Sequence, residues 1–272
     1  MNDVPLPRAR WFAALVALAF TITAFTLGAT TAPARADQHA DDAALGEKVY
    51  DDLKAKYQIV DDSRYLPVLR RVGDKVARAG GPQWYTERFY VVRGNGINAF
   101  SAPGGYVFVN EGLLRTLNNV DELANVLGHE TAHLVLGHVE AKIGQEKRKN
   151  LILGIGKVFV KQGSQASQNT FDTVTKMGNY TFLNFTRQQE YGADELGAQL
   201  AAKAGYNPWG TVWFFQQLVR LVGDAGYEQY VQQHPSTEDR INRISGFLHD
   251  HAAEYARWTN HQPATTSLPT SG

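Results

Sequence analysis

Apolar residues recur at helical spacing in two stretches of the first third of the chain. In residues 41–57 and 63–79, leucine and valine return every three or four positions, which predicts two amphipathic helices. Three short runs rich in β-branched and aromatic residues follow at 89–92, 97–100 and 106–109, with glycine-containing turns between them. These runs predict a small antiparallel sheet.

Helical periodicity returns after the predicted strands. Apolar side chains lie on one face over residues 120–135, Asn118 or Asn119 is a candidate N-cap, and Asp121 and Glu122 suit a first helical turn. Further helices are expected around 179–203, from Asn207-Pro208 after a stop at Gly205, and over 236–248. The predicted fold class is therefore α+β and mainly helical, with the small antiparallel sheet preceding the helix at 120–135.

This helix contains two histidines and a glutamate in a pattern suited to metal chemistry: His129, Glu130 and His133. Residues four apart share a helical face, so both imidazoles can bind one metal ion while the glutamate faces its water. Zinc held by three protein ligands keeps a fourth position for water and lowers the pKa of that water towards about 7. The alternative is a buried helix whose histidines bond to backbone. His138 follows His133 by five positions, off the ligand face, and is expected to be structural.

A third ligand is expected from the helix predicted around 179–203. Glu190 and Asp194 share one face of it, so one carboxylate can bind metal while the other orients a ligand histidine. Glu190 is the expected ligand and Asp194 its helper. The alternative is a solvated acidic stripe, but the alanine and leucine content of this helix argues against full exposure.

A further histidine, His234, precedes Pro235 and should lie in an extended loop before a helix capped at Ser236. From there it could stabilise an oxyanion or take the place of the water as an inhibitory ligand. The alternative is a histidine that caps or packs locally. Arg240 is expected to pair with an acidic residue of the same loop and to have no chemical role.

The N-terminus has the pattern of a secretory signal peptide. A basic start and an uncharged apolar stretch at 11–27 lead to Ala34-Arg35-Ala36, which predicts a signal of residues 1–36. The alternative is an uncleaved anchor. With no cysteine, the chain can form neither a lipid attachment nor a disulfide.

Removal of the signal leaves 236 of the 272 residues, enough for one domain with a core of its own. We expect that domain to span 37–258, followed by a disordered tail at 259–272. The 27 basic and 27 acidic residues of the chain balance, which predicts no nucleic-acid partner. Residues 147–161 have basic flanks and an apolar middle too short to span a membrane, so they suit a lid helix or a peripheral membrane contact.

Several short motifs occur in order between residues 45 and 248, namely Asn98-Ala99-Phe100, Pro103-Gly104-Gly105, Asn110-Glu111-Gly112-Leu113-Leu114, His129 to His133, Glu190 to Asp194, Gly205-Tyr206-Asn207-Pro208 and His234-Pro235-Ser236. Together they resemble the HtpX/BepA-like zinc metallopeptidases, gluzincins related to the CAAX prenyl proteases. The resemblance implies a zincin-like domain that holds one zinc ion per chain and acts on proteins. It makes His129, His133 and Glu190 the zinc ligands and Glu130 the general base. It also implies that the run at 106–109 is the edge strand that aligns an extended peptide.

The function expected from these features is that of a zinc-dependent metalloendopeptidase. Its substrates would be misfolded or unassembled envelope proteins, and its location the bacterial periplasm, either free or held by an uncleaved N-terminal anchor. One alternative is a chaperone or binding module with a peptidase fold and little proteolysis, and another is a hydrolase of non-peptide amides. The presence of Glu130 favours the peptidase, because a binding module needs no carboxylate beside the water. The oligomeric state is not indicated.

Overall fold

The computed structural model describes residues 31–55, 58–145, 185–221, 230–231, 234, 237–263 and 268. Its contacts divide the chain into two units, Met1–Asp41 and Asp42–Gly272. The described part of the first unit is helical, and the site lies in the second. The predicted signal peptide up to residue 30 and the segment 147–161 lie outside the described residues.

The helices are α1 (Thr31–Ala55), α2 (Leu66–Ala79), α3 (Glu111–Thr116), α4 (Val120–Val135), α7 (Arg187–Lys203), α8 (Gly210–Val219) and α10 (Thr237–Asp250). The predicted mainly helical fold is thereby confirmed. Of the two candidate N-caps of α4, Asn119 is the one observed. Its side chain accepts a hydrogen bond of 2.9 Å from the Glu122 backbone N–H.

Three short strands form a mixed sheet, not the fully antiparallel one expected: β1 (Arg88–Val92), β2 (Ala99–Ala102) and β3 (Tyr106–Asn110). The strand order is β1-β3-β2, with β3 antiparallel to β2 and parallel to β1. The tight turn after β2 folds β3 back along it, and β3 then inserts between β2 and β1. Two consecutive reversals of the chain therefore leave the first and third strands parallel.

This order also corrects the expected edge strand. Residues 106–109 belong to β3, which is paired on both sides and offers no free backbone edge. The outer side of β1 is covered in part by the segment before α2, because Val60 N–H donates to the Val91 carbonyl at 2.9 Å. The other edge strand among those described is β2, and no described residue forms a β-bridge with its outer side.

The two faces of the sheet pack against different helices. Along each strand the side chains alternate, so that Phe89, Val91, Val107, Val109 and Ala99 join a large core cluster with α2 and α4. On the opposite face, Tyr106 and Phe108 cluster with Leu53 of α1. One face of the sheet thus packs against α2 and α4.

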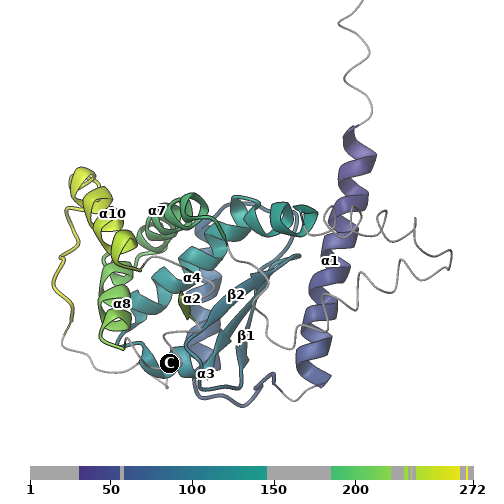
Figure 1. Cartoon of the computed structure of the whole chain (residues 1–272), viewed down its shortest axis with the longest axis horizontal. Helices are drawn as coiled ribbons and strands as arrows, with labels where there is room; N and C mark the ends of the chain where they lie inside the picture. The colour runs from purple at the N-terminus through teal and green to yellow at the C-terminus, as the bar shows by residue number, and fades with distance from the viewer. Residues whose placement is uncertain are drawn as a thin grey trace, which may run out of the picture. The chain divides into compact units, whose positions relative to one another are not determined.

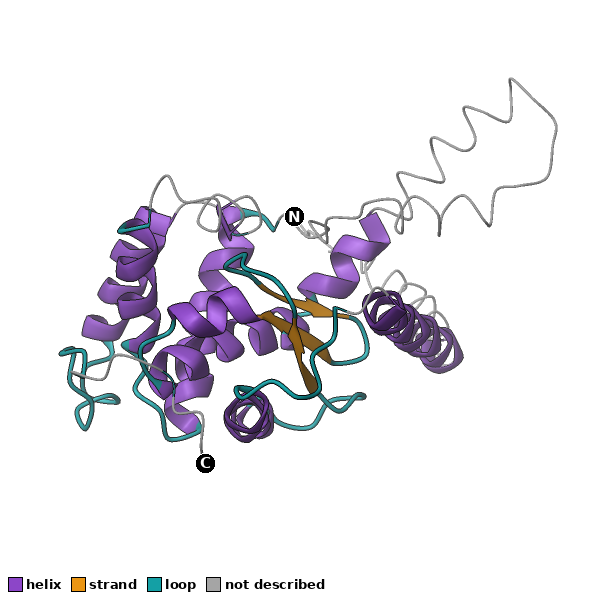
Figure 2. Cartoon of the chain, turned by 90° about the horizontal axis from the view of Figure 1, so that it is seen from below, coloured by secondary structure: helices purple, strands orange, loops and turns teal. Residues whose placement is uncertain are grey.

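Those helices surround α4. It packs against α2, α7, α8 and β2. Figure 1 shows α4 beside the strands, and Figure 2 shows the helices and strands from below. A second apolar cluster joins α8 to α10 through Trp213, Ile244 and Leu248. The helix α10 also packs beside α7, the helix that carries Glu190 and Asp194.

Some described residues of the expected tail at 259–272 contact the domain. The carbonyls of Thr259 and Asn260 accept hydrogen bonds of 2.8 and 3.0 Å from Asn207 and Trp213. Leu268 is 3% exposed and joins the large core cluster. The Thr, Ser and Pro content of the tail indicated low intrinsic structure, and tertiary contacts override it for these residues.

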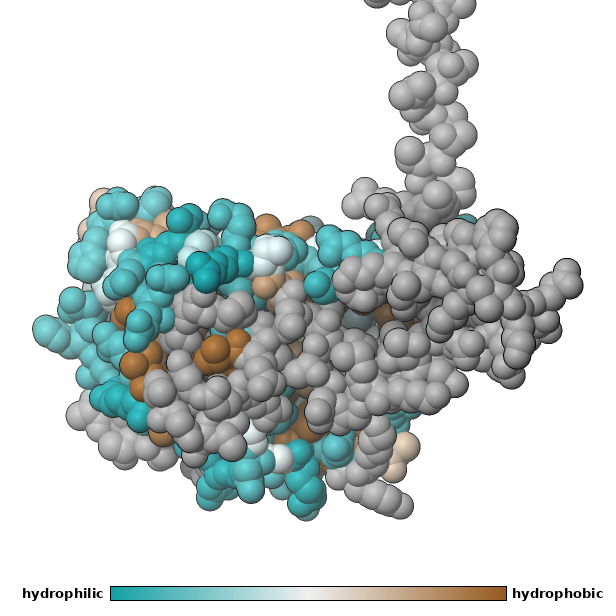
Figure 3. All heavy atoms as spheres, in the orientation of Figure 1, coloured by the Kyte–Doolittle hydropathy of each residue, from teal (hydrophilic) through white to brown (hydrophobic). Residues whose placement is uncertain are grey.

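The described surface in the view of Figure 3 is mainly hydrophilic, with scattered apolar side chains. None of the helices in the described ranges has the length and apolar character needed to cross a membrane.

Candidate metal centre

Helix α4 places the two motif histidines on one buried face, as predicted. His129 is 7% exposed and His133 is fully buried. Their Nε2 atoms are 3.0 Å apart. A tetrahedral zinc ion with Zn–N bonds of about 2.0–2.1 Å would hold two such nitrogens about 3.3 Å apart, so the pair has the spacing of two ligands of one ion.

Helix α7 brings Glu190 to the same point. It begins with a capping box at Thr186 and crosses α4 at a pair of glycines, Gly128 and Gly197. A Cβ atom on Gly197 would lie 2.7 Å from the backbone nitrogen of His129, closer than such contacts occur. Because both residues lack side chains, the helix backbones touch, and the Glu190 carboxylate reaches to 3.5 Å from both His129 Nε2 and His133 Nε2.

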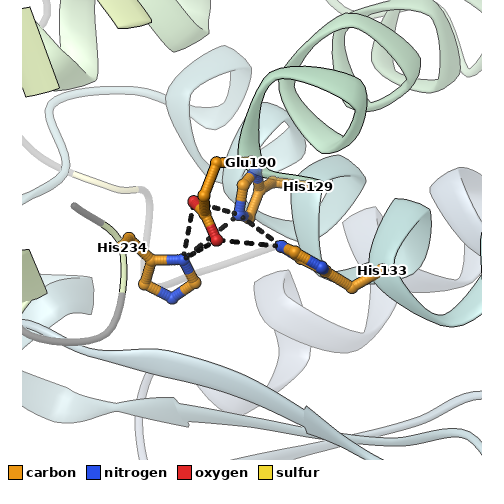
Figure 4. A group of neighbouring side chains, drawn as sticks. All are labelled: His129, His133, Glu190 and His234. Carbon is orange, nitrogen blue, oxygen red and sulfur yellow. Dashed lines mark hydrogen bonds and ion pairs between the residues drawn. The ribbon is translucent and has the colours of Figure 1, made fainter. Parts of the chain in front are cut away.

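His234 completes a group of four that could hold a metal ion. One ligand atom from each of His129, His133, Glu190 and His234 lies within 4.8 Å of the other three, and Figure 4 shows them converging. His234 Nδ1 is 3.1 Å from Glu190 Oε2 and 3.3 Å from His129 Nε2. Three buried imidazoles and a carboxylate facing one another are a donor set that zinc favours, so the residues present fit that ion.

His234 is also supported locally. Its ring stacks on Tyr230 with centroids 5.0 Å apart, and its backbone N–H donates to the Tyr230 carbonyl at 2.8 Å. Its other ring nitrogen, Nε2, is 3.9 Å from Glu130 Oε1. The histidine therefore packs locally and also lies between the ligand group and Glu130.

The residues behind the ligands form a buried ionic network. Asp194 Oδ1 is 2.9 Å from His129 Nδ1, the contact expected of a helper carboxylate. Arg240 is fully buried and donates to both oxygens of Asp194 at 2.6 and 2.7 Å. The same guanidinium lies 2.8 Å from Glu190 Oε2. The prediction that Arg240 pairs with an acidic residue of its own loop was therefore wrong, because its partners Asp194 and Glu190 lie on α7.

A signal for this role of Arg240 was present in the sequence. Arg240, Ile244 and Leu248 are spaced four apart on α10, and all three are buried. An arginine on the apolar face of a helix needs a buried anion, because an unpaired buried charge is costly. Glu190 and Asp194, which the sequence places on another largely apolar helix, are candidates for that buried anion.

Two further contacts were missed. Ser101 of β2 donates to Glu130 Oε2 at 2.7 Å, and an isolated serine in a strand gives no sequence signal for this. His138 lies outside the four-residue group, as expected, but its Nδ1 is 3.1 Å from His133 Nδ1. Helix α4 ends at Val135 and Gly137 adopts a φ of 68°, which turns the chain and returns His138 to the buried ligand.

The protonation states suit metal binding. Burial lowers the pKa of His133 to about 3, so its imidazole is neutral near pH 7. Burial would raise the pKa of Glu190, but the charges of His234 and Arg240 hold it well below the ordinary value. A neutral imidazole beside an ionised carboxylate is the state in which both bind a cation.

Two histidines from one helix, a carboxylate from a second helix and a glutamate in the sequence between the histidines match the arrangement of a metal-dependent hydrolase site. The comparison with known families gives the particular family. The model of peptidase family M48 matches residues 63–248, and the chain belongs to this family. The expectation that the chain belongs to a family of peptidases is therefore confirmed.

Relatives of the chain include proteins that are named as peptidases. The chain is 30% identical over 208 residues to the mitochondrial metalloendopeptidase OMA1 of Schizosaccharomyces pombe, covering 75% of this chain and 60% of the relative. It is 32% identical over 208 residues to OMA1 of Arabidopsis thaliana, covering 75% and 40%. It is 23% identical over 205 residues to the β-barrel assembly-enhancing protease of Escherichia coli K12, covering 72% and 42%. The chain thus spans less than two thirds of the length of each of these relatives.

Proposed function

We propose that this chain is a zinc-dependent metalloendopeptidase that holds one zinc ion through His129, His133 and Glu190. The observation that carries the proposal is the convergence of these three buried ligand atoms with Glu130 alongside, in a chain of the M48 family. Zinc, when bound, supplies a Lewis acid that polarises the substrate carbonyl and acidifies water.

In this proposal Glu130 is the general base. Its Oε2 accepts a hydrogen bond from Ser101, and its Oε1 lies 3.9 Å from Nε2 of His234. Glu130 takes the proton of the attacking water and passes it to the leaving amine. Asp194 accepts the Nδ1 proton of His129, which leaves Nε2 free as a ligand, and Arg240 holds both carboxylates of α7 in place.

The role of His234 has two forms that the geometry supports. Nδ1 is close enough to the other three ligand groups to act as a fourth, inhibitory ligand. With rotation away from Glu190, the same side chain could instead stabilise an oxyanion. A higher activity of His234→Ala supports the inhibitory ligand, and a lower rate with zinc retained supports transition-state stabilisation.

Proteins are the proposed substrates. More specifically, we propose misfolded or unassembled proteins of the bacterial envelope. The predicted signal peptide of residues 1–36 supports export to the periplasm, and the assembly-enhancing protease among the relatives supports a role in protein assembly. The outer edge of β2, with which no described strand pairs, lies next to Glu130 and would suit an extended peptide paired through its backbone. Mass spectrometry of the protein from a periplasmic fraction tests the cleavage after Ala36.

The test of the function compares wild type with Glu130→Gln and Glu190→Gln. Glu130→Gln should keep zinc and lose at least about 10²-fold in cleavage of an unfolded protein such as carboxymethylated casein. Glu190→Gln should lose zinc on dialysis against a chelator. Glu195→Gln is the matched control, because Glu195 lies on the same helix in a surface ion pair with Arg243.

The competing function is a binding or chaperone module. If wild type binds zinc and unfolded protein but cleaves no faster than Glu130→Gln, the binding module is correct and the peptidase proposal fails.

A further inference from the structure

The general base proposed above has one close hydrogen-bond donor from the sheet. Ser101 Oγ lies 2.7 Å from Glu130 Oε2 and 2.9 Å from the Glu130 carbonyl oxygen. Both side chains are buried, each with 3% of its surface exposed. A single residue of β2 therefore contacts both the backbone and the side chain of Glu130.

The hydroxyl has one proton for these two acceptors. A hydrogen bond to an ionised carboxylate is shorter and stronger than one to a neutral carbonyl, and the observed distances follow that order. With Glu130 ionised, the proton of Ser101 is thus directed to Oε2. The other carboxylate oxygen, Oε1, is left on the side of His234 Nε2, 3.9 Å away.

The donor is also on a rigid element. Ser101 is paired in register with Val107 of the central strand, and Ala99 on the same side packs in the large core cluster. The glutamate side chain has several rotatable bonds, so an anchor of one oxygen restricts where the other can lie.

We propose that Ser101 is a positioning residue for Glu130: its hydroxyl holds Oε2 and thereby presents Oε1 to the attacking water. The inference rests on the proposed function, in which Glu130 is the general base. A purely structural role is the alternative, in which Ser101 only ties β2 to α4 through the Glu130 carbonyl.

The experiment uses the full zinc-loaded chain with Ser101→Ala, Ser101→Thr and a control, Thr116→Val. Thr116 donates its hydroxyl to the Gly112 carbonyl at 2.9 Å, which matches the structural half of the Ser101 contact. Ser101→Ala should lower kcat about tenfold, less than the loss on removing the base itself, with KM and zinc content unchanged. Ser101→Thr should restore kcat, and Thr116→Val should keep it.

A second measurement needs no activity. In the metal-free protein, urea unfolding of Ser101→Ala, Glu130→Ala and the double variant should be non-additive, because the carboxylate bond is lost in either single variant. In Glu130→Ala the freed hydroxyl can donate to the residue 130 carbonyl instead, so the coupling reports how much stronger the carboxylate contact is than the carbonyl contact.

Unchanged kcat in Ser101→Ala, or additive unfolding energies, would overturn the inference while leaving the peptidase intact. A folded Ser101→Thr that is as slow as Ser101→Ala would overturn it as well. Equal rates for wild type and Glu130→Gln would instead remove the proposed function, and the positioning role with it.

Discussion

Replacement of Arg240 by methionine should strongly destabilise the metal-free protein. Methionine retains much of the volume but removes the charge that faces Glu190 at 2.8 Å and Asp194 at 2.6 Å. Removing one partner of a buried ion pair costs about 3–5 kcal/mol, because the remaining charge stays buried without compensation. At roughly 2–4 °C per kcal/mol for a domain of this size, Tm should fall by about 6–20 °C.

The matched control is Arg243→Met on the same helix. Arg243 also pairs with a carboxylate, Glu195, at 3.0 Å, but its side chain is 47% exposed. A surface pair of this kind contributes about 0–1 kcal/mol. Urea unfolding of both variants at pH 8, after chelation, measures the difference. Equal losses in the two variants would refute the view that Arg240 is a buried counter-charge, and zinc should recover part of the Arg240→Met loss by compensating Glu190.

Two other substitutions test the packing and the electrostatics. Gly197→Ala should separate α4 from α7 and reduce both zinc retention and Tm, because its Cβ would lie 2.7 Å from a backbone atom, whereas Gly192→Ala on the same helix meets only a side chain at 3.8 Å and should be tolerated. Equal zinc contents of the two variants would count against the close helix crossing. For Glu87, burial raises the pKa to about 7, so its contribution to stability is present below pH 4.5 and is lost as the pH rises through 7. Glu87→Gln should therefore become more stable than wild type by up to about 3 kcal/mol between pH 4.5 and 8, as measured by urea unfolding, and a pH-independent difference would contradict the burial argument.

Local patterns predicted the elements and half of the site. The spacing of His129 and His133 on a helix, and of Glu190 and Asp194 on another, follows from helical geometry alone. Asn119 and the stop at Gly205 follow from capping chemistry, and Gly205 has a φ of 94°. These predictions succeed because each depends on neighbours within a turn or two of the chain.

Apart from the contact between His138 and His133, the missed features depend on contacts between distant segments. The insertion of β3 between β1 and β2 is a choice of topology that three short runs do not specify. The pairing of Ser101 with Glu130 joins residues 29 apart, and that of Arg240 with Asp194 joins residues 46 apart. Only the second left a trace in the sequence, as a charged residue on an apolar helix face.

The charge balance of the site connects these distant contacts to the metal. Two carboxylates, Glu190 and Asp194, contact one guanidinium, Arg240, in the buried interior. One negative charge remains, and a cation among the ligands would offset it. Burial lowers the pKa of His234, but without a cation the negative charge of Glu190 contributes to a net rise. A proton on His234 therefore offsets the same negative charge. A cation and a protonated His234 would thus each offset the charge of Glu190.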